Sequence, residues 1–120
     1  MSSALPSYAE AAAIYTRDHR SAAGKPHLLD PEYGIGDGES DNGGFNGIFA
    51  RWCGLWATQT RNKDILNWLH DNASAALKQQ NKAGLIWGHW EKPTPETGLA
   101  AWECSSAVAL LQDIPVKIPH

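Results

Sequence analysis

Gly44 to Thr60 reads GFNGIFARWCGLWATQT, and its pattern of apolar residues indicates an all-α fold. Its large apolar residues recur at i, i+1, i+4, i+7 and i+8, which places them on one face of an α-helix. They are Ile48, Phe49, Trp52, Leu55 and Trp56. The pattern predicts a helix that begins near residues 41–44, ends near Thr60 and packs through this face.

Helical patterns also flank this stretch. Ser7 and Glu10 form a capping box, which predicts a helix over residues 7–23 that Gly24 and the following Pro stop. Asn62 can cap a further helix, which Gly84 would end. Its apolar stripe consists of Ile65, Leu66, Leu69, Ala73, Ala76 and Leu77.

A last helix is predicted from Thr94–Glu96 onward, because Pro95 suits a first helical turn. It carries Leu99, Trp102, Ala107, Leu110 and Leu111. The connection near Thr60 is short, which makes its two helices antiparallel neighbours. The sequence therefore predicts one all-α domain over residues 1–120, built of antiparallel helical hairpins.

Lys25 to Gly44 forms a long Gly- and Pro-rich segment without periodicity, and we interpret it as a loop across one end of the helices. Asp37, Glu39 and Asp41 alternate in it as in a calcium loop, but Asn42 stands where a turn glycine is needed. Ile48 stands where the bidentate glutamate is needed, so neither a metal nor a cofactor is predicted.

Composition and charge exclude several classes of partner. The net charge is −3 and the basic residues are scattered, which argues against nucleic acid. No apolar run is long enough to suggest a membrane span. Residues 1–6 show no signal-peptide pattern, which leaves the localisation open. Cys53 and Cys104 are interpreted as buried free thiols, with a bridge between two helices as the alternative.

Two Trp residues and one acidic residue are candidates for ligand binding. Trp87 and Trp90 lie in a Gly-flanked loop, where indole rings can stack on the C–H faces of sugars; packing beneath the loop is the alternative. Glu103, beside Trp102, faces either a cleft or solvent.

Residues 43–52, GGFNGIFARW, resemble the signature of glycoside hydrolase family 76, the endo-α-1,6-mannanase family. That signature is Phe-Lys-Gly-Ile-Phe, followed by a small residue and by Arg with an aromatic residue. Other segments follow in family order: an acidic Gly-rich loop before it, and ILNWLHDNA (65–73), a Gly–Trp segment (84–90) and SSAVALL (105–111) after it. The resemblance covers about residues 8–111 and corresponds to the C-terminal third of the family's domain.

The resemblance implies that these helices form an arc of an (α/α)6 toroid. It also implies a retaining glycosidase acting on α-1,6-linked mannan, in a family that is secreted or associated with the cell wall. The family's adjacent Asp-Asp pair lies upstream of the matched region, and this sequence has no adjacent acidic residues. No residue is therefore predicted to be catalytic, and the chain alone is expected to be inactive.

The predicted substrate-binding residues are Asp37, Asp41, Asn46, Trp87, Trp90 and Glu103. Asn46 stands where the family signature has Lys; it keeps hydrogen-bonding capacity but not the charge. The expected ligand is a mannan-type oligosaccharide. One alternative is a non-catalytic helical module that binds carbohydrate or associates with itself through exposed helix faces. Another is a related toroid enzyme acting on a different polysaccharide.

Overall fold

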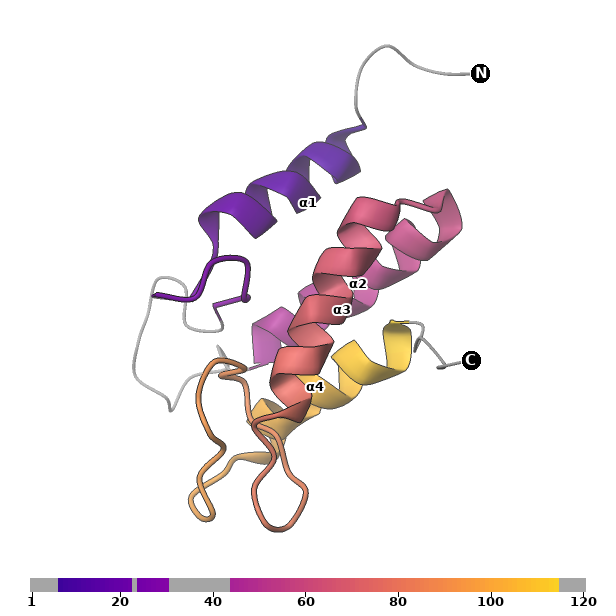
Figure 1. Ribbon diagram of the computed structural model, residues 1–120. Coiled ribbons are helices and arrows are strands. Elements are labelled where there is room, and N and C mark those ends of the chain that lie inside the picture. The colour runs from indigo at the N-terminus through magenta and orange to yellow at the C-terminus, as the bar shows by residue number, and fades with distance from the viewer. Residues whose placement is uncertain (1–6, 23, 31–43, 115–120) are drawn as a thin grey trace, which may run out of the picture.

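The computed structural model describes residues 7–22, 24–30 and 44–114, and these are helical with irregular connections (Figure 1). The helices are α1 (Tyr8–His19), α2 (Phe45–Thr60), α3 (Lys63–Leu77) and α4 (Ala101–Asp113). Across these described ranges there is no β-strand, only an isolated antiparallel bridge between Ser21 and Leu29. The all-α prediction is confirmed.

α3 contributes the largest share of the core. The Asn62 side chain accepts a hydrogen bond of 3.1 Å from the Ile65 N–H, and Asp64 lies in the first turn, as the sequence predicts. One face of the helix is buried, and it comprises Ile65, Trp68, Leu69, Asn72, Ala73 and Ala76. Leu77, at the end of the predicted stripe, is exposed.

α2 and α4 pack together through small side chains. Gly47, Ala50, Gly54 and Ala57 follow one another at heptad spacing on α2, and all four are buried. A Cβ atom on Gly47 would lie 2.5 Å from the Cα atom of Ser106, so only glycine fits against the α4 backbone here. Small residues thus bring the axes of the two helices close together.

The large apolar residues of α2 lie elsewhere, and the predicted packing face is wrong in part. Phe49 and Trp56 pack against the core, but Ile48, Trp52 and Leu55 are exposed. α4 packs against the face of α2 that carries the small residues. The opposite face of α2 therefore points outward. Phe45, Ile48, Trp52 and Leu55 form an exposed row that we name the α2 surface.

α1 begins as predicted, with the Ser7 hydroxyl accepting a hydrogen bond from the Glu10 N–H at 3.1 Å, but it ends at His19 instead of residue 23. After it the chain turns back: Ala22 N–H donates to the Leu28 carbonyl at 2.7 Å. This hydrogen bond to the following turn replaces the one that the Ala22 N–H would have made if the helix had continued.

The turn after α1 is held by α3 side chains. The Asn72 Oδ1 accepts from the Leu29 N–H at 2.9 Å, and its Nδ2 donates to the His27 carbonyl at 3.0 Å. The Trp68 indole N–H donates to the same carbonyl at 2.7 Å. Asn72 has no exposed surface, so this polar cluster fixes the turn from inside the protein.

The loop between α3 and α4 is longer than the sequence predicts at both ends. α3 ends at Leu77, not near Gly84, and Asn81 Oδ1 accepts from the Ala83 and Leu85 N–H groups in a local turn. α4 begins at Ala101, not at Thr94–Glu96. Thr94 is held in the loop instead, because its N–H donates to the Gln79 carbonyl at 3.0 Å.

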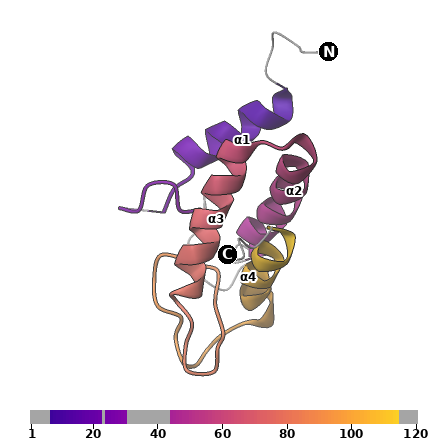
Figure 2. The ribbon, with the colours of Figure 1, turned by 45° about the vertical axis from the view of Figure 1, so that its right-hand side comes forward.

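The elements form a bundle in which α2, α3 and α4 pack together and α1 lies alongside (Figure 2). α2 and α3 are joined at Arg61, whose left-handed backbone (φ 55°) allows the tight reversal. Among the described helices, none combines the length and the apolar character needed to cross a membrane.

Candidate functional site

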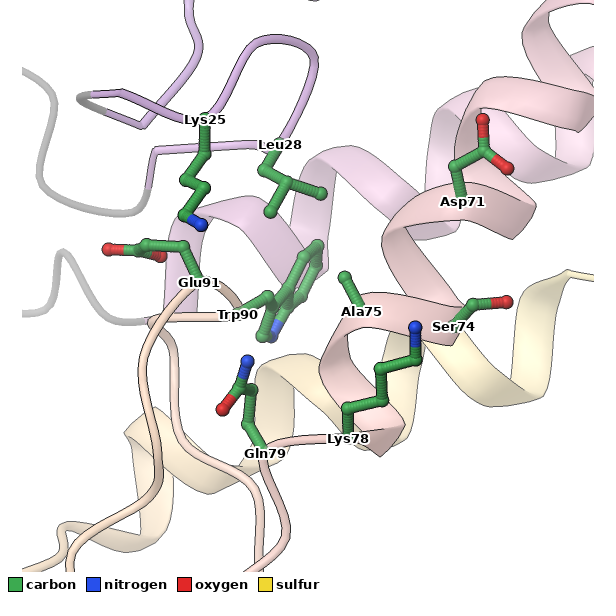
Figure 3. Close-up of a pocket in the computed structure, with 9 residues that line it drawn as sticks. All are labelled: Lys25, Leu28, Asp71, Ser74, Ala75, Lys78, Gln79, Trp90 and Glu91. Atoms are coloured by element: carbon green, nitrogen blue, oxygen red, sulfur yellow. The ribbon is translucent and has the colours of Figure 1, made fainter.

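A pocket of about 360 Å³, with a mixed polar and apolar lining, opens where the turn after α1, the outer side of α3 and the α3–α4 loop meet. We name it the Trp90 pocket (Figure 3). Its lining residues are Lys25, Leu28, Asp71, Ser74, Ala75, Lys78, Gln79, Trp90 and Glu91.

Three separate segments of the chain position these residues. The Asn72 and Trp68 hydrogen bonds hold the turn that carries Lys25 and Leu28. The hydrogen bond from Thr94 N–H to the Gln79 carbonyl holds the loop beside the end of α3. The pocket is therefore built on contacts with the core.

Trp90 forms the floor of the pocket. Its side chain has no exposed surface, and its indole Nε1 has no hydrogen-bond partner within the described ranges. Figure 3 shows the Gln79 amide on the side of the ring that carries this nitrogen, while the Lys78 ammonium group ends beside Ser74, away from the ring. Trp90 thus packs beneath the loop and closes the pocket from below without being exposed itself.

Glu91 and His89 form a buried pair beside the pocket. Glu91 Oε1 lies 3.3 Å from His89 Nδ1, and the two side chains are 9% and 10% exposed. Burial alone would raise the pKa of Glu91. The His89 hydrogen bond, the Glu91 backbone N–H and the His89 and Lys92 charges outweigh it, so this pKa is lowered. Glu91 Oε2 is buried without a hydrogen-bond partner in the described part of the chain.

Trp87 lies at the rim of the same loop and is half-buried. Its ring lies against the His89 ring, with 4.6 Å between their centres, and its indole N–H donates to the Lys92 carbonyl at 3.1 Å. The Thr94 hydroxyl accepts a hydrogen bond from the Trp87 N–H at 3.2 Å. With these contacts made, Trp87 remains partly exposed.

Asn46 ties the first turn of α2 to this loop. Its Nδ2 donates to the Gly88 carbonyl at 2.8 Å, and the residue is 4% exposed. Its Oδ1 is buried and makes no hydrogen bond to any part of the chain that the structure describes. In this arrangement Asn46 supports the loop that carries Trp87 and Trp90.

The structure brings some of the predicted binding residues together. Trp87 and Trp90 lie in the 86–94 loop, and Asn46 donates a hydrogen bond to the Gly88 carbonyl of the same loop. Glu103 lies on α4, where its carbonyl accepts from the Ser106 hydroxyl at 2.9 Å, and it does not line the Trp90 pocket. Asp37 and Asp41 lie outside the described residues, as does most of the predicted 25–44 loop.

The pocket also contains residues that the sequence did not single out. Asp71, Ser74 and Lys78 lie at i, i+3 and i+7, so their common face on α3 could have been found from helical spacing. Lys25 and Glu91 come from distant segments and carry no such signal.

The charges around the Trp90 pocket balance, with the ammonium groups of Lys25 and Lys78 against the carboxylates of Asp71 and Glu91. Across residues 7–22, 24–30 and 44–114, no three His, Cys, Asp or Glu side chains gather as metal ligands would. An uncharged ligand with several hydroxyl groups suits such a lining better than a phosphate or a cation does.

Both cysteines are free thiols. Cys53 is buried, which raises its pKa to about 11 and keeps the thiol protonated. Cys104 is half-buried; burial first and the Glu103 charge second raise its pKa. Neither thiol is activated as a nucleophile.

Comparisons of the chain with protein-family models, with curated proteins and with solved structures found no match.

Proposed function

We propose that this chain is a non-catalytic arc of a helical carbohydrate-processing domain, of the type found in glycoside hydrolase family 76. Its role in that domain is to hold a mannan-type oligosaccharide at the wall of the cleft. The observation that carries the proposal is the Trp90 pocket, which combines an apolar floor with polar groups of balanced charge.

The chemistry of the pocket suits a sugar. Each hydroxyl group of a hexose both donates and accepts, and the lining offers donors on Lys25, Lys78 and Gln79 beside acceptors on Asp71 and Glu91. Trp87, in the same loop as Trp90, is partly exposed, and its indole is proposed to stack on a neighbouring sugar ring. The pocket volume of about 360 Å³ lies within the range of small-molecule sites.

The chain is proposed to bind without cleaving. A retaining glycosidase needs two carboxyl groups roughly 5 Å apart, one as nucleophile and one as acid. The family's adjacent Asp pair has no counterpart in this sequence. The paired carboxyl group of Glu91 has His89 as its partner rather than a second carboxyl group.

Titration with α-1,6-mannotetraose, followed by amide and indole N–H chemical shifts, tests this function. We expect weak, saturable binding with shifts at Lys78, Gln79 and the Trp90 indole. Gln79→Ala removes a lining amide and is expected to weaken binding at least threefold. Gln80→Ala, at an exposed neighbour outside the lining, is the matched control and is expected to leave binding unchanged.

Three outcomes would contradict the proposal. They are no response at millimolar sugar, equal binding of inorganic phosphate, or an equal loss in Gln79→Ala and Gln80→Ala. Release of reducing ends from α-1,6-mannan by the purified chain would overturn the non-catalytic part alone.

The alternative function, a self-associating helical module, is favoured by a different observation. The four side chains of the α2 surface are large and apolar, and each is at least 45% exposed. This surface is separate from the Trp90 pocket, because the two share no residues.

A further inference from the structure

His89 is a buried residue of the 86–94 loop that contacts two residues of the proposed sugar site. Its side chain is 10% exposed, and its Nδ1 lies 3.3 Å from Glu91 Oε1. Its ring also lies against the Trp87 ring, with the two planes inclined by 50°. Glu91 lines the Trp90 pocket, whereas Trp87 does not. His89 therefore bridges the wall of the pocket and the Trp residue outside it.

The contact with Glu91 determines which nitrogen of His89 carries a proton. The pKa of Glu91 is lowered, so its carboxyl group is ionised at neutral pH and can only accept hydrogen bonds. The hydrogen bond therefore requires a proton on His89 Nδ1, which excludes the tautomer protonated on Nε2 alone. His89 thus donates to Glu91 and is held in one ring orientation by doing so.

The carboxylate of Glu91 depends on few groups for its position. Among the residues that the structure describes, its hydrogen bonds come from His89 and from the Glu91 backbone N–H. Its second oxygen, Oε2, is buried without a partner in those ranges. Removing the His89 donor therefore leaves the side chain of a pocket-lining residue without its side-chain anchor.

Trp87 is held at its backbone and at one edge of its ring. The backbone N–H donates to the Thr94 hydroxyl at 3.2 Å, and the indole N–H donates to the Lys92 carbonyl at 3.1 Å. Neither of these partners lines the Trp90 pocket. The His89 ring adds the contact that relates the orientation of the indole to the position of Glu91.

We propose that His89 is the positioning residue of the sugar site, which sets the Glu91 carboxylate and the Trp87 indole for one and the same oligosaccharide. This inference rests on the proposed function, because it concerns the same site. One sugar ring occupies the pocket beside Glu91, and the next ring of the chain stacks on Trp87 outside it. His89 thereby makes the site prefer an oligosaccharide to a single mannose.

Two substitutions separate the two contacts of His89. His89→Phe keeps an aromatic ring beside Trp87 but cannot donate to Glu91. His89→Asn keeps a side-chain N–H near the position of Nδ1 but removes the ring. Each is expected to weaken the binding of α-1,6-mannotetraose about threefold to tenfold. Ile86→Val, at a buried position of the same loop outside the pocket lining, is the control and is expected to bind like the wild type.

Single mannose distinguishes the role of the ring from that of the donor. Mannose is expected to occupy the pocket without reaching Trp87, so His89→Asn should bind it like the wild type. His89→Phe should bind it more weakly, because the contact with Glu91 is lost. An equal loss of mannose and mannotetraose binding in His89→Asn would contradict the preference for an oligosaccharide.

Chemical shifts recorded without sugar identify the contact that each variant has lost. His89→Asn is expected to shift the Trp87 indole N–H and to leave the Glu91 carboxyl carbon in place, and His89→Phe is expected to do the reverse. A residue that merely supports the fold of the loop would move both signals in both variants, and that result would overturn the proposal. Circular dichroism checks folding; if His89→Phe is unfolded, His89→Asn alone decides.

The titrations also separate this inference from the function on which it rests. A wild type that does not bind mannotetraose overturns the proposed function and this inference with it. A wild type that binds, together with His89 variants that bind equally well, overturns the positioning role alone. An equal loss of binding in Ile86→Val would show a general effect of the loop and would overturn the same role.

Discussion

The large apolar side chains of α3 face the core, whereas most of those of α2 face outward. The two helices are similar in length, with 15 and 16 residues, and both carry apolar stripes. Leu69 of α3 has no exposed surface, while Leu55 of α2 is 45% exposed. The difference arises from the neighbours: α4 approaches α2 so closely at Gly47 that only small residues fit between the two helices.

Side-chain size therefore does not decide which face of a helix is buried. α3 fills the space among its neighbours with Ile65, Trp68 and Leu69, where helix axes lie far enough apart for such side chains. α2 meets α4 along glycine and alanine, where backbone contact itself provides the packing. Its bulky residues are then available for contacts with other molecules.

Two leucine-to-alanine substitutions test this contrast most strongly. Leu69→Ala leaves a cavity in the core and is expected to lower the free energy of unfolding by about 2–5 kcal/mol. Leu55→Ala removes a half-exposed side chain and is expected to cost about 1 kcal/mol or less. Urea unfolding of dilute, monomeric protein, followed by circular dichroism, measures both. Equal losses would show that α2 packs through the face that carries Leu55, so that this face is not exposed.

The sequence predicts the starts of α1 and α3 well, because their capping signals are local. The Ser7 and Asn62 caps are where the sequence places them, and the α3 stripe faces the core apart from its last residue. The packing face of α2 is not predictable in the same way. It depends on the contact between Gly47 and Ser106, residues far apart in the sequence.

Helix ends are the other part of the fold that local patterns miss. Residues 20–23 read as a continuation of α1, but Asn72 and Trp68 of α3 bind the following turn and draw the chain back. Thr94–Glu96 reads as a helix start, but Gln79 and Trp87 bind Thr94 in the loop. In both places, hydrogen bonds from distant residues override a local preference.

The buried asparagines of α3 and α2 allow a second comparison of the two helices, with smaller expected losses of stability. Asn72→Ala removes hydrogen bonds to Leu29, His27 and Trp68 and is expected to cost about 2–3 kcal/mol of unfolding free energy. Asn46→Ala removes one hydrogen bond, to Gly88, from a residue whose Oδ1 is unpaired among the described residues, and is expected to cost about 1 kcal/mol. Chemical unfolding of both variants measures the difference.

Asn72→Asp serves as a control for this test. It keeps an acceptor for the Leu29 N–H but loses the donors to His27 and Trp68, so it should also destabilise the protein. A larger loss for Asn46→Ala than for Asn72→Ala would contradict the central role of α3.

The candidate site shows the same limits of sequence reasoning. Trp87 and Trp90 are correctly placed in a loop, yet which of them is open to a ligand depends on the packing of α3 and of the 24–30 turn against that loop. Lys25 and Glu91 meet at one pocket only because Asn72 holds the turn and Gln79 holds the loop. The polar face of α3 can be predicted from the sequence, but the residues that face it across the pocket, such as Lys25 and Glu91, cannot.

The loop between α3 and α4 is tested through the pH dependence that Glu91 gives to stability, and this is the smallest of the expected effects. Because the pKa of Glu91 is lowered in the folded protein, its ionised form stabilises the fold. That contribution is complete above the usual glutamate value of 4.5 and is lost as the pH falls through the lower, folded-state value. The stability advantage of the wild type over Glu91→Gln is therefore expected to shrink as the pH is lowered below about 4.5.

Urea unfolding of both proteins over a pH series measures this advantage, and a His89→Ala background identifies its cause. His89 supplies both the hydrogen bond and part of the charge that hold the Glu91 carboxylate ionised, so its removal should flatten the pH dependence. A wild-type advantage that grows as the pH falls would mean that burial raises the pKa of Glu91 after all. The loop would then be held to α2 and α3 by its backbone contacts at Gly88 and Thr94, without help from this charge pair.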